Sequence, residues 1–161
     1  MIAEFPSIKT MNANLLDRGI SVLILGVEKE PGFHLPELTN LLLKIEALQK
    51  VKFIVFVDAE LAIDNLNALV WYVTGNIDPK RDCKVFKATK QNEVNHLVVD
   101  GTRKTFQTDG FRRDWPNPVV SCTETISLVD RRWPEYGLGP MIPSPSLIYS
   151  PLRRGDGAIS E

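Results

Sequence analysis

Residues 52–82 read KFIVFVDAELAIDNLNALVWYVTGNIDPKRD, and this stretch decides the fold class. It starts inside the apolar run Val51–Val57, which is typical of a short strand buried on both faces of a sheet. Asp64 suits the N-cap of a helix over Asn65–Tyr72, and Gly75-Asn76 is typical of a left-handed helix end. A buried strand followed closely by a helix indicates an α/β unit.

The same alternation continues on both sides of this stretch. The apolar run Ile20–Val27 predicts a strand, and Ser7–Leu16 predicts its hairpin partner. We expect further elements as follows: a helix over Leu35–Gln49, strands over Cys83–Phe86 and His96–Val99, and a helix over Thr123–Trp133. The prediction is a single α/β layered domain over residues 1–133, with a mixed central sheet flanked by helices.

The last part of the chain has a different composition. Five of the 11 prolines lie there: Pro134, Pro140, Pro143, Pro145 and Pro151. Proline lacks the backbone N–H that regular helices and central strands need. We therefore expect residues 134–161 to be an extended proline-rich tail, packed on the domain or on a neighbouring protomer.

Overall composition excludes several classes of protein. The 161 residues are enough for one compact core, and 43% hydrophobic with 24% charged residues is close to a globular average. The formal net charge of -1 gives no long-range attraction to nucleic acid or to an anionic membrane. The longest apolar stretch, Phe53–Val57, is far below the ~20 residues that span a bilayer. We expect no nucleic-acid partner and no integral membrane segment.

The cysteines and the N-terminus predict a cytoplasmic protein. Cys83 and Cys122 match no metal or redox spacing, so we expect two reduced thiols. The N-terminal sequence MIAEFPSIK lacks the basic start and the apolar run of a signal peptide.

Two acidic residues and one charged turn are the first candidates for a site. Asp58 and Glu60 follow the buried strand, at the edge where open α/β sheets bind ligands. The alternative for Asp58 is a structural role as a cap of the following turn. Arg81, in the turn Asp78–Asp82, could hold a phosphate or carboxylate, or could instead pair with Asp82.

The remaining candidates are weaker. His34 and His96 have no partner at metal-ligand spacing, so the sequence predicts no metal site. The pairs Trp115-Pro116 and Trp133-Pro134 could stack on bases, although such pairs more often wedge a turn against a core. There is no GxGxxG, Walker or GxSxG motif. From its residues alone, the chain has no self-contained catalytic constellation.

Residues 52–82 resemble the C-terminal domain of the UbiD-family decarboxylases. Members carry an apolar strand ending in Asp, a helix with Asn and then Trp, and a D-P-x-R-D turn. Here these are Val57-Asp58, Asn67 with Trp71, and Asp78–Asp82. The resemblance extends to Val99–Thr102 and Arg113–Pro116, and the ending with Tyr136–Gly139 and Ile142–Ser146 is most similar to a menaquinone-type or Bacteroidetes-type branch.

The resemblance implies a parent carboxy-lyase that uses prenylated FMN, with a divalent metal and a monovalent cation at the cofactor phosphate. Such enzymes decarboxylate aromatic or α,β-unsaturated acids, including ubiquinone and menaquinone precursors. The catalytic Arg and two Glu belong to the preceding flavin-binding domain, so no catalytic residue is carried onto this chain. Many members place a phosphate-directed Lys four residues before the Asp of a D-[AG]-T turn, and here that position is His96.

We therefore expect the C-terminal domain of a UbiD-like decarboxylase, inactive alone and binding no cofactor alone. Its expected partners are the missing N-terminal flavin-binding domain and further copies of itself in a homo-oligomer whose interface the tail crosses. The alternative is a stand-alone binding or assembly module that kept the fold without the chemistry. A self-sufficient enzyme using Asp58 and Glu60 as acid and base is a third, weaker alternative.

Overall fold

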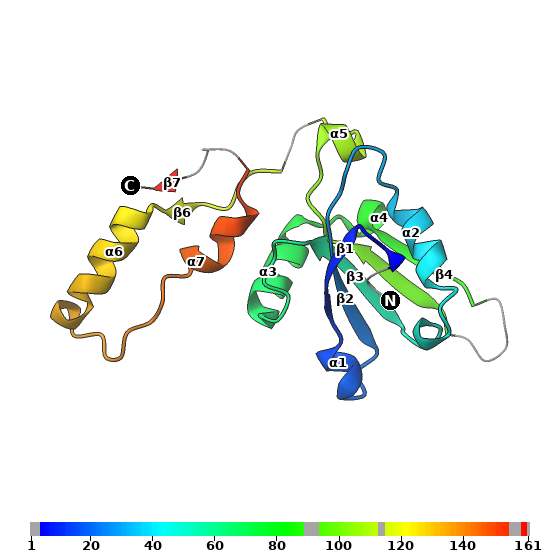
Figure 1. Ribbon diagram of the computed structural model, residues 1–161, viewed down its shortest axis with the longest axis horizontal. Helices are drawn as coiled ribbons and strands as arrows, with labels where there is room; N and C mark the ends of the chain where they lie inside the picture. Colours follow the sequence, from blue (N-terminus) through cyan, green and yellow to red (C-terminus); the bar gives the residue numbers. More distant parts are fainter. Residues whose placement is uncertain (1–3, 89–93, 113–114, 155–158, 161) are drawn as a thin grey trace. The chain divides into compact units, whose positions relative to one another are not determined.

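The structure is a computed structural model that describes residues 4–88, 94–112, 115–154 and 159–160. The chain divides into two compact units, Met1–Trp115 and Pro116–Glu161 (Figure 1). In the described part of the chain, no helix is long and apolar enough to cross a membrane.

The first unit is built on a mixed five-stranded sheet. Its strands are β1 (Ile8–Asn12), β2 (Val22–Val27), β3 (Phe53–Asp58), β4 (Cys83–Phe86) and β5 (His96–Asp100). They lie in the order β1-β2-β3-β5-β4. The central strands β2, β3 and β5 are parallel, and both edge strands pair antiparallel to their neighbours. This confirms the predicted α/β class and the mixed sheet.

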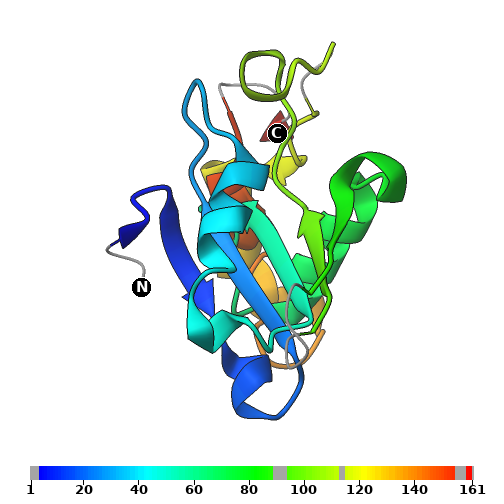
Figure 2. The same ribbon diagram turned by 90° about the vertical axis from the view of Figure 1, so that its right-hand side faces the viewer.

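Helices cover both faces of this sheet. They are α1 (Asn14–Asp17), α2 (Leu35–Leu42), the 3-10 turn η2 (Glu46–Leu48), α3 (Leu66–Asn76), α4 (Pro79–Asp82) and α5 (Phe106–Asp109). Helices α2 and α3 lie on opposite sides of the strands (Figure 2). The α2 side carries the main core, in which Leu38 and Leu42 pack with Leu25, Ile54 and Phe56.

Two predicted helices differ from the structure at their ends. The helix expected over Leu35–Gln49 ends at Leu42, because Ile45 has an extended backbone that turns the chain while Leu48 still reaches the core. The cap of α3 is Asn65, whose side chain accepts from the Ala68 amide at 3.1 Å, so the prediction of Asp64 was wrong by one residue. Helix α3 also continues through Gly75, so its predicted left-handed end was wrong.

The second unit contains β6 (Val120–Ser121), α6 (Thr123–Arg132), η3 (Trp133–Tyr136), α7 (Ser146–Tyr149), η4 (Ser150–Leu152) and β7 (Ile159–Ser160). Strands β6 and β7 pair in parallel. Helix α6, which we placed with the α/β domain over residues 1–133, is grouped in this unit.

The expected extended tail is not confirmed. Pro134 and Pro151 each lie in the first turn of a short 3-10 segment, η3 and η4. Proline is compatible with that position because its fixed φ is helical and the missing N–H would be unpaired there anyway. The prolines therefore limit the length of these helical turns rather than forbid them.

Candidate functional site

Polar side chains gather where the three parallel strands of the first unit end. Asp58 is the last residue of β3 and Asp100 the last of β5, and the register places both at the same edge of the sheet. The loop that begins at residue 101, described through residue 112, leaves from this edge. We call Asp58, Arg81, Asp82, Asp100 and Lys104 the carboxyl-end cluster.

Asp58 joins three elements. Its Oδ2 accepts hydrogen bonds from the Tyr72 hydroxyl of α3 at 2.7 Å and from the Arg103 amide of the loop at 2.8 Å. The side chain is buried, and this burial raises the pKa of Asp58 above its ordinary value, with a further contribution from Glu60. The predicted role of Asp58 as a cap of the following turn was wrong: its carboxylate accepts from the distant Arg103 amide and the Tyr72 hydroxyl instead. Glu60 is half-buried.

Arg81 forms an ion pair with its neighbour Asp82, as the alternative predicted, and is not an open site for a phosphate or carboxylate. Its Nε and one terminal nitrogen donate to the two oxygens of Asp82 at 2.8 and 2.6 Å, a two-pronged ion pair. The Asp78 side chain caps α4 by accepting from the amides of Lys80 and Arg81. Burial opposes ionisation of Asp82, but the hydrogen bonds from Arg81 and the Asp78 amide hold the pKa of that carboxyl below its usual range.

Lys104 is the member of the cluster that the sequence did not reveal. Its ammonium group is buried and donates to the carbonyl oxygens of Asp100 and Thr102 at 3.0 and 2.9 Å. It also lies 2.9 Å from an Asp100 carboxylate oxygen and 3.7 Å from one of Asp82. The Trp115 ring covers it, with its centroid 5.2 Å from Nζ. The sequence feature that could have indicated this site is a basic residue, Lys104, two residues after the Asp100-Gly101-Thr102 turn.

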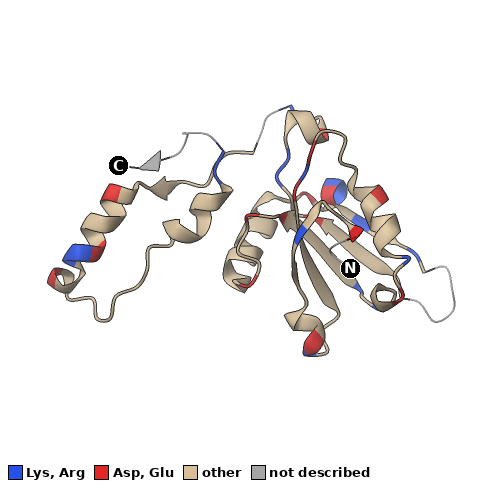
Figure 3. Cartoon of the chain, viewed as in Figure 1, with Lys and Arg blue, Asp and Glu red and all other residues tan. Residues whose placement is uncertain are grey.

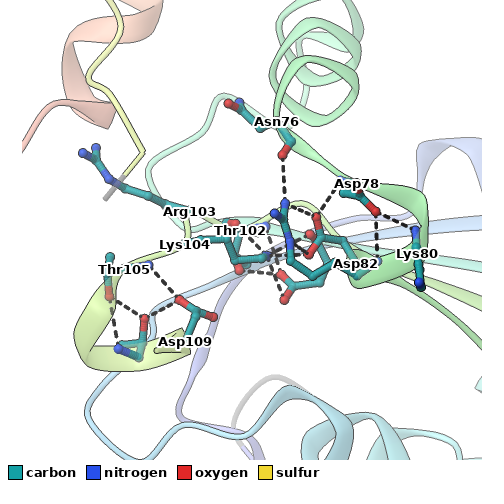
Figure 4. Close-up of polar contacts among 12 residues, drawn as sticks. Asn76, Asp78, Lys80, Asp82, Thr102, Arg103, Lys104, Thr105 and Asp109 are labelled. Carbon is teal, nitrogen blue, oxygen red and sulfur yellow. Dashed lines mark hydrogen bonds and ion pairs between the residues drawn. The ribbon is translucent and has the colours of Figure 1, made fainter. Parts of the chain in front are cut away.

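A second anchor holds the far side of the same loop. Lys29, just after β2, donates to the Arg103 carbonyl at 2.6 Å and to both oxygens of Asp109 at 2.8 and 2.7 Å. Burial opposes ionisation of Asp109, but its bonds to Lys29, Thr108 and the Thr105 amide lower its pKa. The loop is thus tied to β2 through Lys29, to β3 through Asp58 and to α4 through Lys104. Figure 4 shows how Lys104 and Asp82, and Thr105 and Asp109, lie in this part of the fold.

This arrangement positions a chain segment and offers no reactive group. Arg81 and Lys104 pair with the carboxylates of Asp82 and Asp100, which is the condition for keeping charges in a protein interior, while Asp58 is held by hydrogen bonds from the Tyr72 hydroxyl and the Arg103 amide. A hollow of about 110 Å³ opens beside Asp82 and Asp100. Pockets for ligands of drug or cofactor size are larger, about 300–1,000 Å³.

The structure places the other predicted residues apart from this cluster. His96 is buried at the opposite end of β5, where its Nδ1 lies 2.6 Å from the Val51 carbonyl oxygen. That placement favours a core histidine, and its role toward a cofactor phosphate stays a prediction. His34 is exposed at the start of α2. Cys83 and Cys122 are free thiols.

The two Trp-Pro pairs differ in setting. Trp115 is buried against Lys104, as the wedge alternative predicted. Trp133 donates from its indole nitrogen to the Gly139 carbonyl at 3.0 Å. Arg113 and Asp114, which contributed to the family resemblance, lie outside the described residues.

The side chains at this edge do not fit the groups that the resemblance implies. Within residues 4–88, 94–112, 115–154 and 159–160, no three His, Cys, Asp or Glu side chains come together in a way that could hold a metal ion. The two cations of the cluster, Arg81 and Lys104, are already bonded to carboxylates and are not available for a flavin phosphate. No step of a reaction is therefore assigned to a cofactor held at this cluster.

Two structures of known decarboxylases have a similar fold. Vanillic acid decarboxylase of Sedimentibacter hydroxybenzoicus, in its closed form, superposes with a TM-score of 0.62 at 13% identity, over 86% of this chain and 30% of that one. An evolved dimeric form of the UbiD-class enzyme HmfF from Pelotomaculum thermopropionicum, in complex with prFMN, gives 0.52 at 20% identity, over 70% and 24%.

Sequence comparison finds relatives that are much longer. Uncharacterized proteins of Aeropyrum pernix and Archaeoglobus fulgidus are 33% and 30% identical over 107 and 98 residues. These alignments cover 60% and 55% of this chain but only 22% and 20% of the relatives. Residues 1–105 match the family model for the 3-octaprenyl-4-hydroxybenzoate carboxy-lyase C-terminal domain. This chain therefore belongs to the UbiD C-terminal domain family.

Proposed function

We propose that this chain serves as the C-terminal domain of a UbiD-type carboxy-lyase that removes carbon dioxide non-oxidatively from an aromatic or α,β-unsaturated acid. One observation carries the proposal. The residues that match the family model, 1–105, contain the whole five-stranded sheet, and at its carboxyl edge Arg81 and Lys104 are paired with Asp82 and Asp100. A domain of this kind supports a reaction whose chemistry lies elsewhere in the enzyme.

The division of labour follows from the resemblance. The flavin-binding part of the enzyme would hold prenylated FMN, with a divalent metal and a monovalent cation at its phosphate, and would contribute the catalytic Arg and two Glu. The cofactor, when bound, supplies the electron sink for decarboxylation. A substrate among the quinone precursors is the finer proposal, and the menaquinone-like ending of this chain supports it.

The residues of this chain would shape and close the enzyme. The start of the loop, held by hydrogen bonds to Asp58, Lys29 and Lys104, would give the domain an ordered edge to pack against the flavin-binding part. Residues 134–152 would reach a neighbouring protomer in a homo-oligomer. We propose a cytoplasmic enzyme, which the free thiols Cys83 and Cys122 support.

The test is to express the chain in two forms, alone and joined to the coding sequence that lies upstream of it, each with a flavin prenyltransferase. We expect flavin absorbance and release of carbon dioxide from aromatic acids only in the longer form. Tight flavin binding by the chain alone would overturn the proposed division of labour.

The alternative of a stand-alone assembly module makes a different prediction for the same experiment. A stop codon with a ribosome-binding site directly upstream, and no carbon dioxide release in any form, would favour that alternative. A continuous upstream reading frame that encodes a flavin-binding domain would exclude it.

A further inference from the structure

The turn of residues 100–104, which follows β5, surrounds a cation with oxygen atoms. The cation is the chain's own Lys104 ammonium group, and this residue is only 3% exposed. Its Nζ lies 3.0 and 2.9 Å from the carbonyl oxygens of Asp100 and Thr102, and 2.9 Å from Oδ2 of Asp100. Oδ1 of Asp82 lies 3.7 Å away, and Figure 4 shows the Lys104 side chain directed toward that residue. We call these four oxygen atoms the cation cage.

The carboxylates of the cation cage are held by partners other than the ammonium group. Oδ1 of Asp100 accepts hydrogen bonds from the Thr102 amide at 3.1 Å and from the Thr102 hydroxyl, which leaves Oδ2 directed into the cage. Asp82 is held by the Arg81 guanidinium at 2.8 and 2.6 Å and by the Asp78 amide at 2.7 Å. These bonds keep both carboxylates oriented independently of the cation between them.

The backbone of the turn is fixed in the same way. The Gly101 amide donates to the Phe56 carbonyl at 2.8 Å, and the Arg103 amide donates to Asp58 at 2.8 Å. A Cβ added to Gly101 would lie 2.9 Å from Cγ2 of Val73 and 3.0 Å from the Phe56 carbonyl oxygen, so the turn packs closely on the sheet and on α3. The two carbonyl oxygens of the cage therefore stay in place when the side chain at position 104 is shortened.

The charge and the distances of the cage suit a monovalent ion. Basic and acidic residues lie together at this end of the sheet (Figure 3). The carboxylates of Asp82 and Asp100, with Arg81 paired to the first, leave one negative charge for the cation to balance. Contacts of 2.9–3.0 Å are longer than the ligand distances of about 2.3–2.6 Å for Ca²⁺ and about 2.0–2.1 Å for Mg²⁺. Backbone carbonyl oxygens also replace the hydration shell of potassium in channel filters.

We propose that Asp82 and the turn of residues 100–104 form a binding site for a monovalent cation of ammonium or potassium size, which the chain fills with its own Lys104. A hollow of about 110 Å³, lined in part by Lys84, Asp82 and Asp100, gives a free ion a route to the cage once the lysine stem is removed. A tethered ammonium group has a high effective concentration at the site. The order of the turn is therefore independent of the ions in solution.

The first test compares two substitutions in the full chain by urea denaturation. Lys104→Ala removes the stem and opens the cage, whereas Lys104→Met removes the charge but fills the same space. We expect potassium or methylammonium chloride to lower the unfolding equilibrium constant of Lys104→Ala about tenfold for each tenfold rise in ion concentration above the dissociation constant, as one bound ion requires. Tetramethylammonium chloride at equal ionic strength is the reference, because this ion is too large for the cage and has no N–H to donate.

The wild type and Lys104→Met should respond equally to potassium and to tetramethylammonium. An equal response of Lys104→Ala to the two salts would contradict the site, and stronger stabilisation by calcium than by potassium would contradict its monovalent character. If Lys104→Ala does not fold in the reference salt, refolding is followed instead by circular dichroism. Recovery in potassium or methylammonium is then expected, and a chain that stays unfolded in every salt overturns the proposal.

A second pair of substitutions tests whether the ion binds in the cage. In the Lys104→Ala background, Asp100→Asn removes a carboxylate of the cage and should abolish the difference between potassium and tetramethylammonium. Glu28→Gln removes an exposed carboxylate that pairs with Lys9 at 3.1 Å, and it should leave the difference unchanged. Loss of the potassium effect in both variants would indicate a general response to negative charge, and loss in neither would place the ion elsewhere; either result contradicts the proposal.

Direct binding is measured with the thallous ion, a heavy monovalent ion that substitutes for potassium and quenches indole fluorescence. After Trp71→Phe and Trp133→Phe, the remaining tryptophan is Trp115, whose ring centroid lies 5.2 Å from the Lys104 ammonium group. We expect saturable quenching in Lys104→Ala, reversed by potassium, and only weak linear quenching in Lys104→Met. Linear quenching in both variants would show that the cage binds no free ion.

Discussion

The two units of this chain differ in how they are stabilised. Every residue of the main buried cluster lies between Ile8 and Val98, in the first unit. The described part of the second unit buries Val120 and Leu152 and leaves Leu138, Met141, Ile142 and Leu147 exposed. The first unit therefore contains the main hydrophobic core, whereas the described part of the second unit buries few apolar side chains.

Charges follow the same division. The first unit contains the buried ion pairs of Lys104 with Asp82 and Asp100. The ion pair described in the second unit, Arg132 with Glu135, is exposed, with side chains 49% and 61% accessible. Buried pairs depend strongly on both partners, while exposed pairs contribute little.

The largest effect is expected for Lys104→Met. Removing this ammonium group leaves the carboxylates of Asp82 and Asp100 without a buried counter-charge, so the free energy of unfolding should fall by about 3–5 kcal/mol. Urea denaturation measures the change. The control is Lys9→Met, which breaks the exposed pair with Glu28 and should cost less than about 1 kcal/mol. Equal effects of the two substitutions would mean that the Lys104 site is not buried as described.

A matched pair of leucines compares the two units directly. Leu42 is fully buried in the first unit and Leu152 is 4% exposed in the second. Leu42→Ala should lower the free energy of unfolding by about 2–4 kcal/mol through lost contacts and a cavity. Leu152→Ala should leave the main unfolding transition in place, since that transition belongs to the first unit. Calorimetry of both variants checks this, and an equal shift would show that the units unfold as one.

Asp58 provides a prediction with a pH dependence. Because burial raises its pKa in the folded state, ionisation costs stability, and this cost grows as pH rises from about 4 through the folded pKa. Asp58→Asn keeps an acceptor and cannot ionise, so its stability relative to wild type should improve over that pH range. Asp58→Ala removes the acceptor of Tyr72 and the Arg103 amide and should cost about 2–3 kcal/mol. Denaturation at several pH values tests both variants. If the free energy of unfolding of the wild type rises relative to that of Asp58→Asn as pH increases, the raised pKa of Asp58 is contradicted.

The smallest effect is expected in the second unit. Arg132→Ala removes an exposed ion pair with Glu135 and should change the free energy of unfolding by less than about 0.5 kcal/mol. The measurement is a thermal melt at low and at high salt. A loss as large as that for Lys104→Met would show that the second unit has charged interactions as important as those of the first.

The order of the strands and helices could be predicted from local patterns. The runs at Ile20–Val27, Val51–Val57 and Cys83–Phe86 each became a strand, because alternation or continuity of apolar residues is decided within a few residues. Helix ends were predicted less well. Ile45 interrupts the first predicted helix because the chain must turn toward β3, a requirement that no local pattern encodes.

For the site, the sequence pointed to Asp58 and to the Arg81-Asp82 pair but not to Lys104 or Lys29. The Asp58 signal came from its position after a buried strand, and the Arg81 signal from an adjacent acid. Lys104 and Lys29 lie 22 and 80 residues from the carboxylates of Asp82 and Asp109 that they contact. Only the order of strands in the sheet brings such distant residues together.

By itself, the sequence of this chain determined the α/β class, the mixed sheet and the resemblance to the UbiD C-terminal domain, since these depend on local apolar periodicity and on short motifs. The tertiary structure decided which charges are buried together at the carboxyl edge and which apolar surfaces stay open. Burial is a property of surfaces that meet across the fold, and its free energy depends on partners that lie far apart in the chain. Strand β3 is the clearest case: the run at Val51–Val57 predicted a strand buried on both sides, and the structure leaves Phe53 44% exposed and Val55 half-buried.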